Sequence, residues 1–460
     1  MERSHITRPM WLLWFLSAAL IGLDGFDFFI IGVALPFIKL DFSMDATQTG
    51  AIAVAAILGS LVGSLTLGPV TDRVGRQLML AIDVVIFVVA STATALAWNV
   101  TSLIVFRFLV GIGIGADYPI SVAYITENVP SRFRGRMVIG AFTFQSLGAL
   151  LGAVTGLAVI RFFQVTYPDA LLASTHYAWR WMLGVGSILA VAVAILRFQF
   201  LLESPLYYIA RGEYEQASQA ASELLEHPVN ISAENEPLPR DSKLNYAALF
   251  SPEFAKRTIL AAVPWFLQDI ATYGVGIFTP VIIAMLAFAD ETDFVMREFR
   301  SAQGAAFVEV FLVVGFILAI LLVERVGRIP LQVTGFIGMA VGLSLLAFDS
   351  HNSSDMQLTS ANLMMILAGF VIFNLFMNMG PNATTFLLSG EVFPTAIRAS
   401  GAGLAAGIAK SGAVLGTFGL PILRQSYGEQ VLLFGVAGAC LLGAGITYLF
   451  RVDTSGQPLT

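Results

Sequence analysis

The chain has 460 residues, of which 57% are hydrophobic and only 12% are charged, and its mean hydropathy is +0.79. A soluble domain carries about 25% charged residues, so this composition excludes a water-soluble protein and indicates a polytopic membrane protein. The net charge of −6 comes with no concentrated basic patch, which excludes a nucleic-acid partner.

Twelve apolar stretches follow one another along the chain, each long enough to cross a bilayer as a helix of about 20 residues. They are predicted at residues 11–38, 47–70, 78–97, 101–124, 137–162, 180–202, 257–287, 303–323, 330–348, 360–388, 400–420 and 430–450. The first stretch continues past signal-peptide length and has no small-residue cleavage site, so we expect a retained helix.

A polar stretch at residues 203–256 divides these helices into two sets of six, and a short helix is expected within it at about 213–226. The predicted fold is an all-α membrane protein of twelve transmembrane helices in two pseudo-symmetric bundles. The expected domains are an N-terminal six-helix bundle (1–202), a cytoplasmic linker (203–256) and a C-terminal six-helix bundle (257–460).

Arginine residues are concentrated in alternate loops, whereas the intervening loops are acidic or nearly uncharged. The basic loops follow the second, fourth, eighth and tenth predicted helices and contain Arg73 and Arg76, Arg132, Arg134 and Arg136, Arg325 and Arg328, and Arg398. Because cytoplasmic loops carry the excess of Lys and Arg, both termini are expected in the cytoplasm, in a multi-pass protein of the cell membrane.

Two loop motifs occur once in each half of the chain. The sequence DRVGR at 72–76 reappears as ERVGR at 324–328, and ENVPSRFR at 127–134 reappears as EVFPTAIR at 391–398. Duplicated bundles transport a substrate by rocking one half against the other. We interpret these loops as gates rather than only as determinants of solubility and topology. An exposed ion pair contributes only about 0–1 kcal/mol, so several must act together. The predicted gating residues are Asp72, Arg73, Arg76, Glu127, Arg134, Glu324, Arg325, Arg328, Glu391 and Arg398.

The fourth predicted helix carries an acid in the middle of an apolar run. Asp117 follows Gly111, Gly113 and Gly115. An aspartate at membrane depth costs about 2.5–3.5 kcal/mol on insertion scales, so its presence indicates a function. The alternative is a helix whose glycines allow close packing and whose Asp117 only bonds a neighbouring helix.

The first predicted helix contains two acids three residues apart, Asp24 and Asp27, which lie on one face. Two close carboxylates in a low dielectric cannot both remain ionised, so at least one is expected to hold a proton near neutrality. No Lys or Arg is expected inside the first-half helices to neutralise them. The alternative is that both carboxyl groups only form hydrogen bonds with neighbouring groups.

Polar residues in later helices suggest a binding site. Trp265, Asp269 and Tyr273 are spaced by four residues and should lie on one face of the seventh helix. Gln145, in the fifth helix, either joins this site or hydrogen-bonds to a neighbouring helix. Lys410, in the eleventh helix, needs either an acid such as Asp269 or an anionic substrate as its partner.

The tenth predicted helix contains Asn374, Asn378 and Asn382, spaced by four residues around Gly380-Pro381. The proline frees a backbone carbonyl and is expected to break or kink the helix. Broken helices are where transporter binding sites tend to form.

Several of these motifs resemble a known family. The segments GPVTDRVGRQ, ERVGR and LLESPLYY resemble the major facilitator superfamily over essentially the whole chain. Within it, GIGIGADYPIS, FNLFMNMGPNATTF and GEVFPTAIR are similar to the phosphate:proton symporters. The chain departs from the usual pattern of those symporters at Ala116, which replaces a glycine, and at Val122-Ala123-Tyr124. Organic-anion and sugar relatives share the loop motifs, which therefore do not decide the substrate.

The resemblance implies roles for individual residues. Matched motif by motif, the substrate residues are Tyr118, Gln145, Trp265, Asp269, Tyr273 and Asn382, with Lys410 nearby. The proton route of the family implies Asp24, Asp27 and Asp117 as the proton-coupling residues.

We therefore predict a monomeric proton-coupled symporter of inorganic phosphate, with a small anion, protons and membrane lipid as its partners. A proton-coupled carrier of an aromatic acid or a sugar is the alternative favoured by Ala116 and Tyr124. A phosphate-sensing receptor is a second alternative, disfavoured by the short tails. No metal-ligand cluster, nucleotide loop or nucleophile–base pair is recognisable, so no metal, no cofactor and no enzymatic activity are expected.

Overall fold

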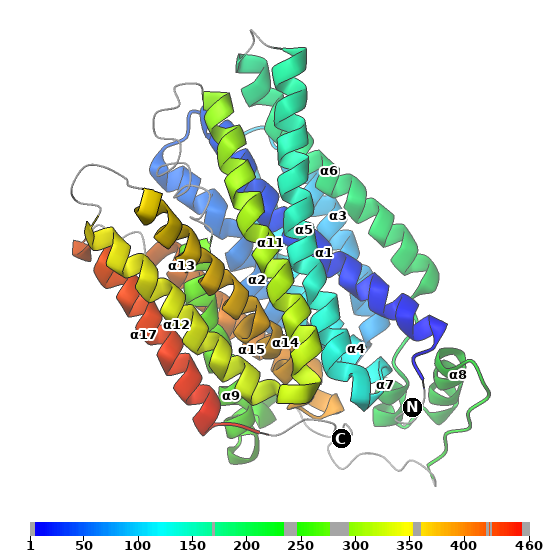
Figure 1. The fold of residues 1–460 in the computed structure, drawn as a ribbon. Coiled ribbons are helices and arrows are strands. Elements are labelled where there is room, and N and C mark those ends of the chain that lie inside the picture. Colours follow the sequence, from blue (N-terminus) through cyan, green and yellow to red (C-terminus); the bar gives the residue numbers. More distant parts are fainter. Residues whose placement is uncertain are drawn as a thin grey trace.

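The computed structural model describes residues 5–167, 171–233, 246–276, 294–352, 360–419, 423 and 426–452. In these ranges the regular structure is helical, and long helices run side by side through the molecule (Figure 1). Nine helices within the described ranges are long and apolar enough to cross a membrane. A further pair, 367–391 and 395–419, passes the same test together and turns by 115° at a short break.

The first half of the chain forms six long helices, as predicted. They are α1 (Arg8–Asp41), α2 (Ala46–Val74), α3 (Arg76–Ala95), α4 (Val100–Asn128), α5 (Ser131–Thr166) and α6 (Leu171–Phe200). Asp45 and Asn99 each form a capping box at the start of α2 and α4, and both helices continue at their C-terminal ends beyond the predicted apolar stretches.

The polar stretch that follows contains the expected short helix and a second one. They are α8 (Tyr214–Leu225) and α7 (Pro205–Arg211), with the 3-10 turn η2 (Tyr246–Phe250) after them. The helix α7 was not predicted; it begins at a Ser204 cap followed by a proline. The α7 and α8 helices lie at the same end of the bundle as the first turn of α1 and the last turn of α17 (Figure 1).

The second half is less regular than the first. Its elements are α9 (Pro252–Ala271), the π-helical turn η3 (Thr272–Gly276), α11 (Phe294–Val326), α12 (Arg328–Asn352), α13 (Ser360–Met379), α14 (Pro381–Glu391), the 3-10 turn η4 (Thr395–Ile397), α15 (Arg398–Val414), the π-helical turn η5 (Leu415–Gly419) and α17 (Glu429–Leu449). The break between α13 and α14 falls at Gly380-Pro381, as predicted. The part of the predicted helix 257–287 that follows Gly276 lies outside the described residues.

Glycines bring α2 and α4 into backbone contact. A Cβ atom added to Gly115 would lie 2.0 Å from the carbonyl oxygen of Ser60, and one added to Gly111 would lie 2.0 Å from that of Ala56. Only glycine tolerates this approach, which explains Gly111 and Gly115, whereas Gly113 faces Phe87 of α3. The two halves then meet where α2 packs on α15 and α5 packs on α11, and the α5–α11 pair crosses the centre of Figure 1.

Candidate functional site

The duplicated loop motifs join the two halves at the end of the bundle that carries α7 and α8. The carboxyl oxygen Oε1 of Glu127 accepts hydrogen bonds from Arg76 and from Arg398, each at 3.0 Å. All three side chains are buried. Because Glu127 belongs to the first half and Arg398 to the second, this ion pair holds the halves together.

A second link between the halves is formed by Asp72. Its carboxylate accepts hydrogen bonds from the backbone N–H and the hydroxyl of Ser400, at 2.7 and 2.6 Å, and forms an ion pair with Arg76 at 3.1 Å. Ser400 lies in the first turn of α15, where the helix dipole favours an anion. The Arg76 guanidinium also donates to the carbonyl of Thr395, at 3.1 Å.

The repeated motif of the second half forms its own ion pairs. Arg328 contacts Glu324 at 2.9 Å and Glu391 at 3.0 Å. Two predicted gating residues differ from the others: the side chains of Arg73 and Arg325 are exposed, and neither forms an ion pair in the part of the chain that the structure describes. Arg134, by contrast, is buried.

A cavity of about 220 Å³ lies between the halves, on the far side of this seal. It is lined by residues of α1, α2, α4 and α5 from the first half and of α9, η3, α11, α13, α14 and α15 from the second. Its lining extends to Leu35 and Ala53, close to the turn between α1 and α2. Five of the seven predicted substrate residues contribute to this lining: Gln145, Asp269, Tyr273, Asn382 and Lys410.

Lys410 forms the best-defined contacts in the cavity. Its ammonium group lies 3.0 Å from the Asp269 carboxylate and donates to the Tyr273 hydroxyl at 2.8 Å. Both partners were predicted on one helical face, but the helix changes to π-helical geometry at Thr272, so Tyr273 lies beyond the regular part. Lys410 and Asp269 are buried, so removal of either side chain would leave the other charge buried and unpaired, at a high cost in free energy.

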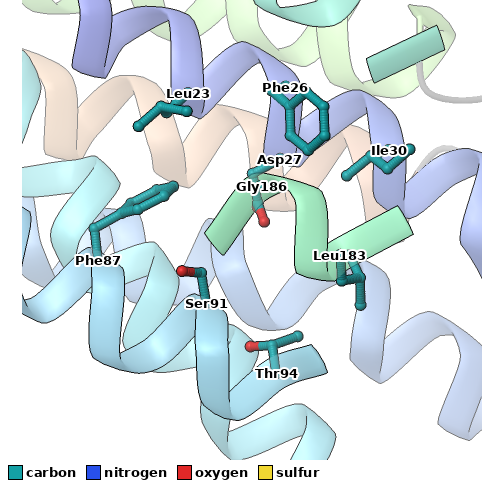
Figure 2. A pocket seen from close by; sticks show the side chains of 9 residues that line it. All are labelled: Leu23, Phe26, Asp27, Ile30, Phe87, Ser91, Thr94, Leu183 and Gly186. Atoms are coloured by element: carbon teal, nitrogen blue, oxygen red, sulfur yellow. The ribbon is translucent and has the colours of Figure 1, made fainter. Parts of the chain in front are cut away.

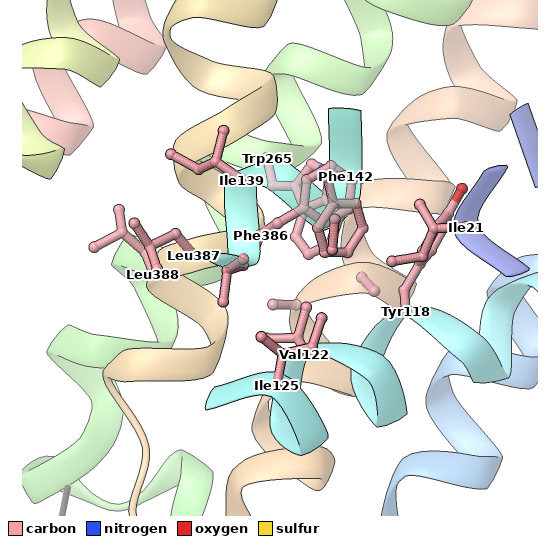
Figure 3. Close-up of a cluster of buried hydrophobic side chains, with 14 of the residues drawn as sticks. Ile21, Tyr118, Val122, Ile125, Ile139, Phe142, Trp265, Phe386, Leu387 and Leu388 are labelled. Carbon is pink, nitrogen blue, oxygen red and sulfur yellow. The ribbon is translucent and has the colours of Figure 1, made fainter. Parts of the chain in front are cut away.

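The other two predicted substrate residues lie behind the cavity wall, in an aromatic layer (Figure 3). The ring of Phe142, from the first half, stacks on that of Phe386, from the second, with centroids 3.7 Å apart. Tyr118 and Trp265 pack on Phe386 at 5.6 and 4.7 Å. Tyr118 still reaches the polar lining, because its hydroxyl accepts a hydrogen bond from Gln145 at 2.8 Å.

Amides complete the polar lining on the side of the second half. Asn382 donates to Asn378, and Gln268 reaches the Asn382 oxygen at 3.5 Å. The buried Gln268 oxygen has no hydrogen-bond partner among the described residues. A ligand that offers both donors and acceptors would therefore find partners for each in this wall.

Within the first half, Asp117 lies next to two charged residues that the sequence reading did not consider. Its Oδ1 atom accepts from Arg197 at 3.1 Å and from Ser121 at 2.9 Å. Arg197 also lies 3.6 Å from the carboxylate of Asp83, and all three charged side chains are fully buried. These residues form an acid–guanidinium cluster inside the bundle.

The expectation that no Arg lies inside the first-half helices is wrong. Arg107 and Arg197 both fall within predicted spans, near their ends, and their long side chains extend into the protein interior. The two acids of the first helix therefore have different environments. Asp27 pairs with Arg107 at 2.6 Å, whereas both oxygens of Asp24 are buried without a hydrogen-bond partner among the described residues.

The Asp27–Arg107 pair separates two cavities. Arg107 lines the large cavity between the halves, whereas Asp27 lines a small one of about 10 Å³ inside the first half. Figure 2 shows the Asp27 carboxyl group pointing toward the side of Ser91 and Thr94. A space of this size accommodates about one water molecule.

Four ionisable residues of the predicted helices were missed: Asp83, Arg107 and Arg197 in the first half, and Glu309, which lies on α11 and lines the large cavity. Each lies within a predicted apolar span, and a charge in such a span was the signal that could have identified it. For metals, no group of three or more His, Cys, Asp or Glu side chains within the described ranges could hold an ion.

Comparison with known proteins identifies the family. The family model of the sugar (and other) transporters matches residues 14–460, so the chain belongs to this family. It is 27% identical to the probable inorganic phosphate transporter 1-12 of Oryza sativa subsp. japonica, over 95% of this chain and 88% of that protein. It is also 28% identical to the putative metabolite transport protein YaaU of Escherichia coli (strain K12), over 95% and 90% of the two chains.

Solved structures confirm the predicted fold. The proton:xylose symporter XylE, of the major facilitator superfamily, superimposes with a TM-score of 0.79 at 18% sequence identity, over 99% of this chain and 98% of that one. The inward-open conformation of the xylose transporter XylE from E. coli gives a TM-score of 0.68. The molecule is therefore a multi-pass membrane transporter with the all-α major facilitator fold, and its resemblance to the phosphate transporters is supported by its relatives.

Proposed function

We propose that this protein is a proton-coupled symporter of inorganic phosphate that works by alternating access between its two six-helix bundles. The observation that carries the proposal is the buried Lys410 cation, which contacts Asp269 and Tyr273 in a cavity between the halves. A cation in this position can attract an anion, while the carboxylate beside it restricts which anions are accepted.

Dihydrogen phosphate suits this combination of groups. Its unprotonated oxygens can accept hydrogen bonds from Lys410, and its O–H groups can donate to the Asp269 carboxylate. Sulfate has no hydrogen to donate, so it would leave a buried acceptor unpaired. An unpaired buried group costs about 1–3 kcal/mol, and more when it is charged. Sites that depend on such bonds discriminate strongly between similar ligands.

The acid–guanidinium cluster of the first half supports proton coupling. Together with the neighbouring Asp24 and the Asp27–Arg107 pair, it comprises four carboxyl groups and two guanidinium groups, those of Asp24, Asp27, Asp83, Asp117, Arg107 and Arg197. If every group were ionised, the buried cluster would carry two uncompensated negative charges. Burial of an unpaired charge is costly, so we propose that Asp24, Asp27 and Asp117 bind the protons that accompany the substrate.

The orientation proposed from the loop arginines gives these parts an order of action. With both termini and the 203–256 linker in the cytoplasm, the seal at Glu127 and Asp72 closes the cytoplasmic end of the cell-membrane protein. Protons and phosphate would load from outside, and rupture of the Glu127–Arg398 and Asp72–Ser400 contacts would let the halves rock inward.

A second candidate function is proton-coupled transport of an aromatic organic acid. Phe28, Phe29 and Phe386 line the same cavity, and aromatic walls of this kind suit a ligand with a ring. Uptake of a radiolabelled benzoate-like acid under the same proton gradient separates the two candidates, with hexoses as further competitors. Accumulation of the aromatic acid, with no phosphate uptake, would favour the second.

The test of phosphate symport is uptake of radiolabelled phosphate into proteoliposomes under an inward proton gradient. We expect accumulation above the external concentration, and its collapse when a protonophore is added. No uptake by correctly inserted, folded protein would refute the proposal.

Asp24 offers a clean test of the coupling role. Because neither of its oxygens has a hydrogen-bond partner among the described residues, Asp24→Asn breaks no bond. We expect this variant to lose accumulation of phosphate against its concentration gradient while it retains transport of phosphate down that gradient. Unchanged accumulation by Asp24→Asn would show that Asp24 is not required for coupling.

A further inference from the structure

One acid in the large cavity has no role in the transport cycle described so far. Glu309 lies on α11, and its side chain lines the cavity together with Val308 and Leu312. Its Oε2 atom is buried and has no hydrogen-bond partner among the described residues. The surrounding helical segment, FVEVFLVVGF, is otherwise apolar. An ionisable residue in such a segment indicates a function rather than a packing role.

The other charges of the cavity are already paired. Arg107 forms an ion pair with Asp27 at 2.6 Å, and Lys410 forms one with Asp269 at 3.0 Å. The remaining titratable group in the lining is Tyr273, which accepts from Lys410.

In the part of the chain that the structure describes, the helices packed against α11 place no cation in the cavity lining. These are chiefly α5 and α13, with smaller contacts from α12 and α1. Within the described ranges, α5 and α13 contribute Gln145, Ser146, Asn374 and Asn378 to the lining, besides apolar residues, and α1 contributes none that is charged. With Asp27 ionised against Arg107 and Asp269 ionised against Lys410, both cations are balanced, so an ionised Glu309 would add one uncompensated negative charge to the cavity.

We propose that Glu309 is a proton-binding site within the substrate cavity, and that the proton it binds is required for an anionic substrate to bind tightly. The inference rests on the proposed transport of an anion. A carboxylate and an anion that share one cavity repel each other, whereas a neutral carboxyl group does not and can also donate a hydrogen bond. The step involves one proton, which passes from water to Glu309, and no other bond changes.

Thermodynamic linkage turns this arrangement into coupling. If a proton on Glu309 raises the affinity for the anion, a bound anion must raise the affinity of Glu309 for its proton by the same factor. Such couplings typically amount to about 5–150-fold. Because Glu309 belongs to the second half, it would add a proton site separate from the acid cluster of the first half.

The test compares the KM for phosphate of wild-type and Glu309→Gln proteins in proteoliposomes, from about pH 5.5 to about pH 8 on the outside. Phosphate's own titration affects both proteins equally, so the difference between the two curves isolates Glu309. We expect the wild-type KM to rise with pH at least about fivefold more than that of the variant. At the alkaline end, Glu309→Gln should bind phosphate more tightly than the wild type.

Glu298→Gln is the matched control. Glu298 lies on the same helix, pairs with Arg297 at 3.3 Å and is not part of the cavity lining, so its curve should follow that of the wild type. Parallel KM curves for wild type and Glu309→Gln would overturn the inference. A KM of Glu309→Gln that exceeds the wild-type KM by the same factor at every pH would also overturn it, because Glu309 would then be a direct ligand of the substrate.

Two further measurements keep the outcome decisive. If Glu309→Gln is not active, the pH dependence of phosphate binding to the detergent-solubilised variant replaces the uptake assay, with Glu309→Asp as the variant that retains a titrating group. Absence of phosphate uptake by the wild type would refute phosphate symport itself. Wild-type uptake with parallel KM curves would refute only the role of Glu309.

Discussion

Removal of the Glu127 charge should open the seal between the halves. In Glu127→Gln the carbonyl oxygen can still accept the hydrogen bonds that Oε1 receives from Arg76 and Arg398, and the new amide occupies the place of Oε2, which has no partner among the described residues. The change therefore removes charge while it largely preserves shape. Arg76 retains Asp72 as a partner, but Arg398 loses its ion pair with Glu127.

The expected magnitude follows from this loss. Breaking a buried ion pair by removing one partner costs about 3–5 kcal/mol. If the separated halves expose Arg398 to water, most of this cost applies only to the sealed state. A difference of about 3 kcal/mol shifts the conformational equilibrium roughly 100-fold toward the opposite state.

The assay is the rate at which a membrane-impermeant maleimide labels a cysteine placed at Ala53, on the cavity wall, in a Cys440→Ser background. Labelling should be slower in Glu127→Gln, because the end of the cavity at Ala53 closes when the seal at the opposite end opens. Asp41→Asn is the control, since the partners of Asp41 among the described residues are His176, Trp179 and Arg180, all in the first half. Equal labelling rates for Glu127→Gln and its parent would refute this reasoning.

Two further predictions concern stability, measured as thermal unfolding in detergent. A Cβ atom at Gly25 would lie 1.8 Å from the backbone carbonyl oxygen of Gln145, so Gly25→Ala should destabilise the protein by at least about 1–3 kcal/mol. Gly50→Ala is the control, because a Cβ atom there would meet no atom within 4 Å. Equal melting temperatures for the two variants would contradict this prediction. Burial raises the pKa of the Glu203 carboxyl despite hydrogen bonds from backbone N–H groups. The raised pKa means that the folded state binds this proton more tightly, so its contribution is present below about pH 4.5 and is lost as the pH rises. The stability advantage of the wild type over Glu203→Gln should therefore shrink between about pH 4 and pH 7, and a constant difference would argue against the raised pKa.

Local sequence features predicted most of the architecture, because hydropathy and loop charge are read one segment at a time. The broken helix at Gly380-Pro381 is an example: the proline removes a backbone donor and follows a glycine, whereas Pro36, Pro69 and Pro119 lie inside continuous helices. Asp269 was predicted as one of two possible partners of Lys410, the other being an anionic substrate, because a buried cation requires an anion.

Long-range features were harder to predict. Arg197 lies 80 residues from Asp117, and no local pattern relates the two. The π-helical turn at Tyr273 also departs from the regular spacing assumed for the seventh helix. It lies where Gly416 of η5 approaches the backbone of Ile270 and Gly274, a contact between segments far apart in the sequence.

The groups of the cavity and of the acid cluster are unevenly divided between the two halves. Asp269, Asn382 and Lys410 belong to the second half, whereas Asp117, Arg107 and Arg197 belong to the first. Under the proposed function, most groups that select the substrate therefore lie in the second half, and most acids that bind protons lie in the first, with Gln145 and Glu309 as the exceptions. Substitutions confined to α9, α14 and α15 would then change which substrate is carried and leave the acids of the first half in place.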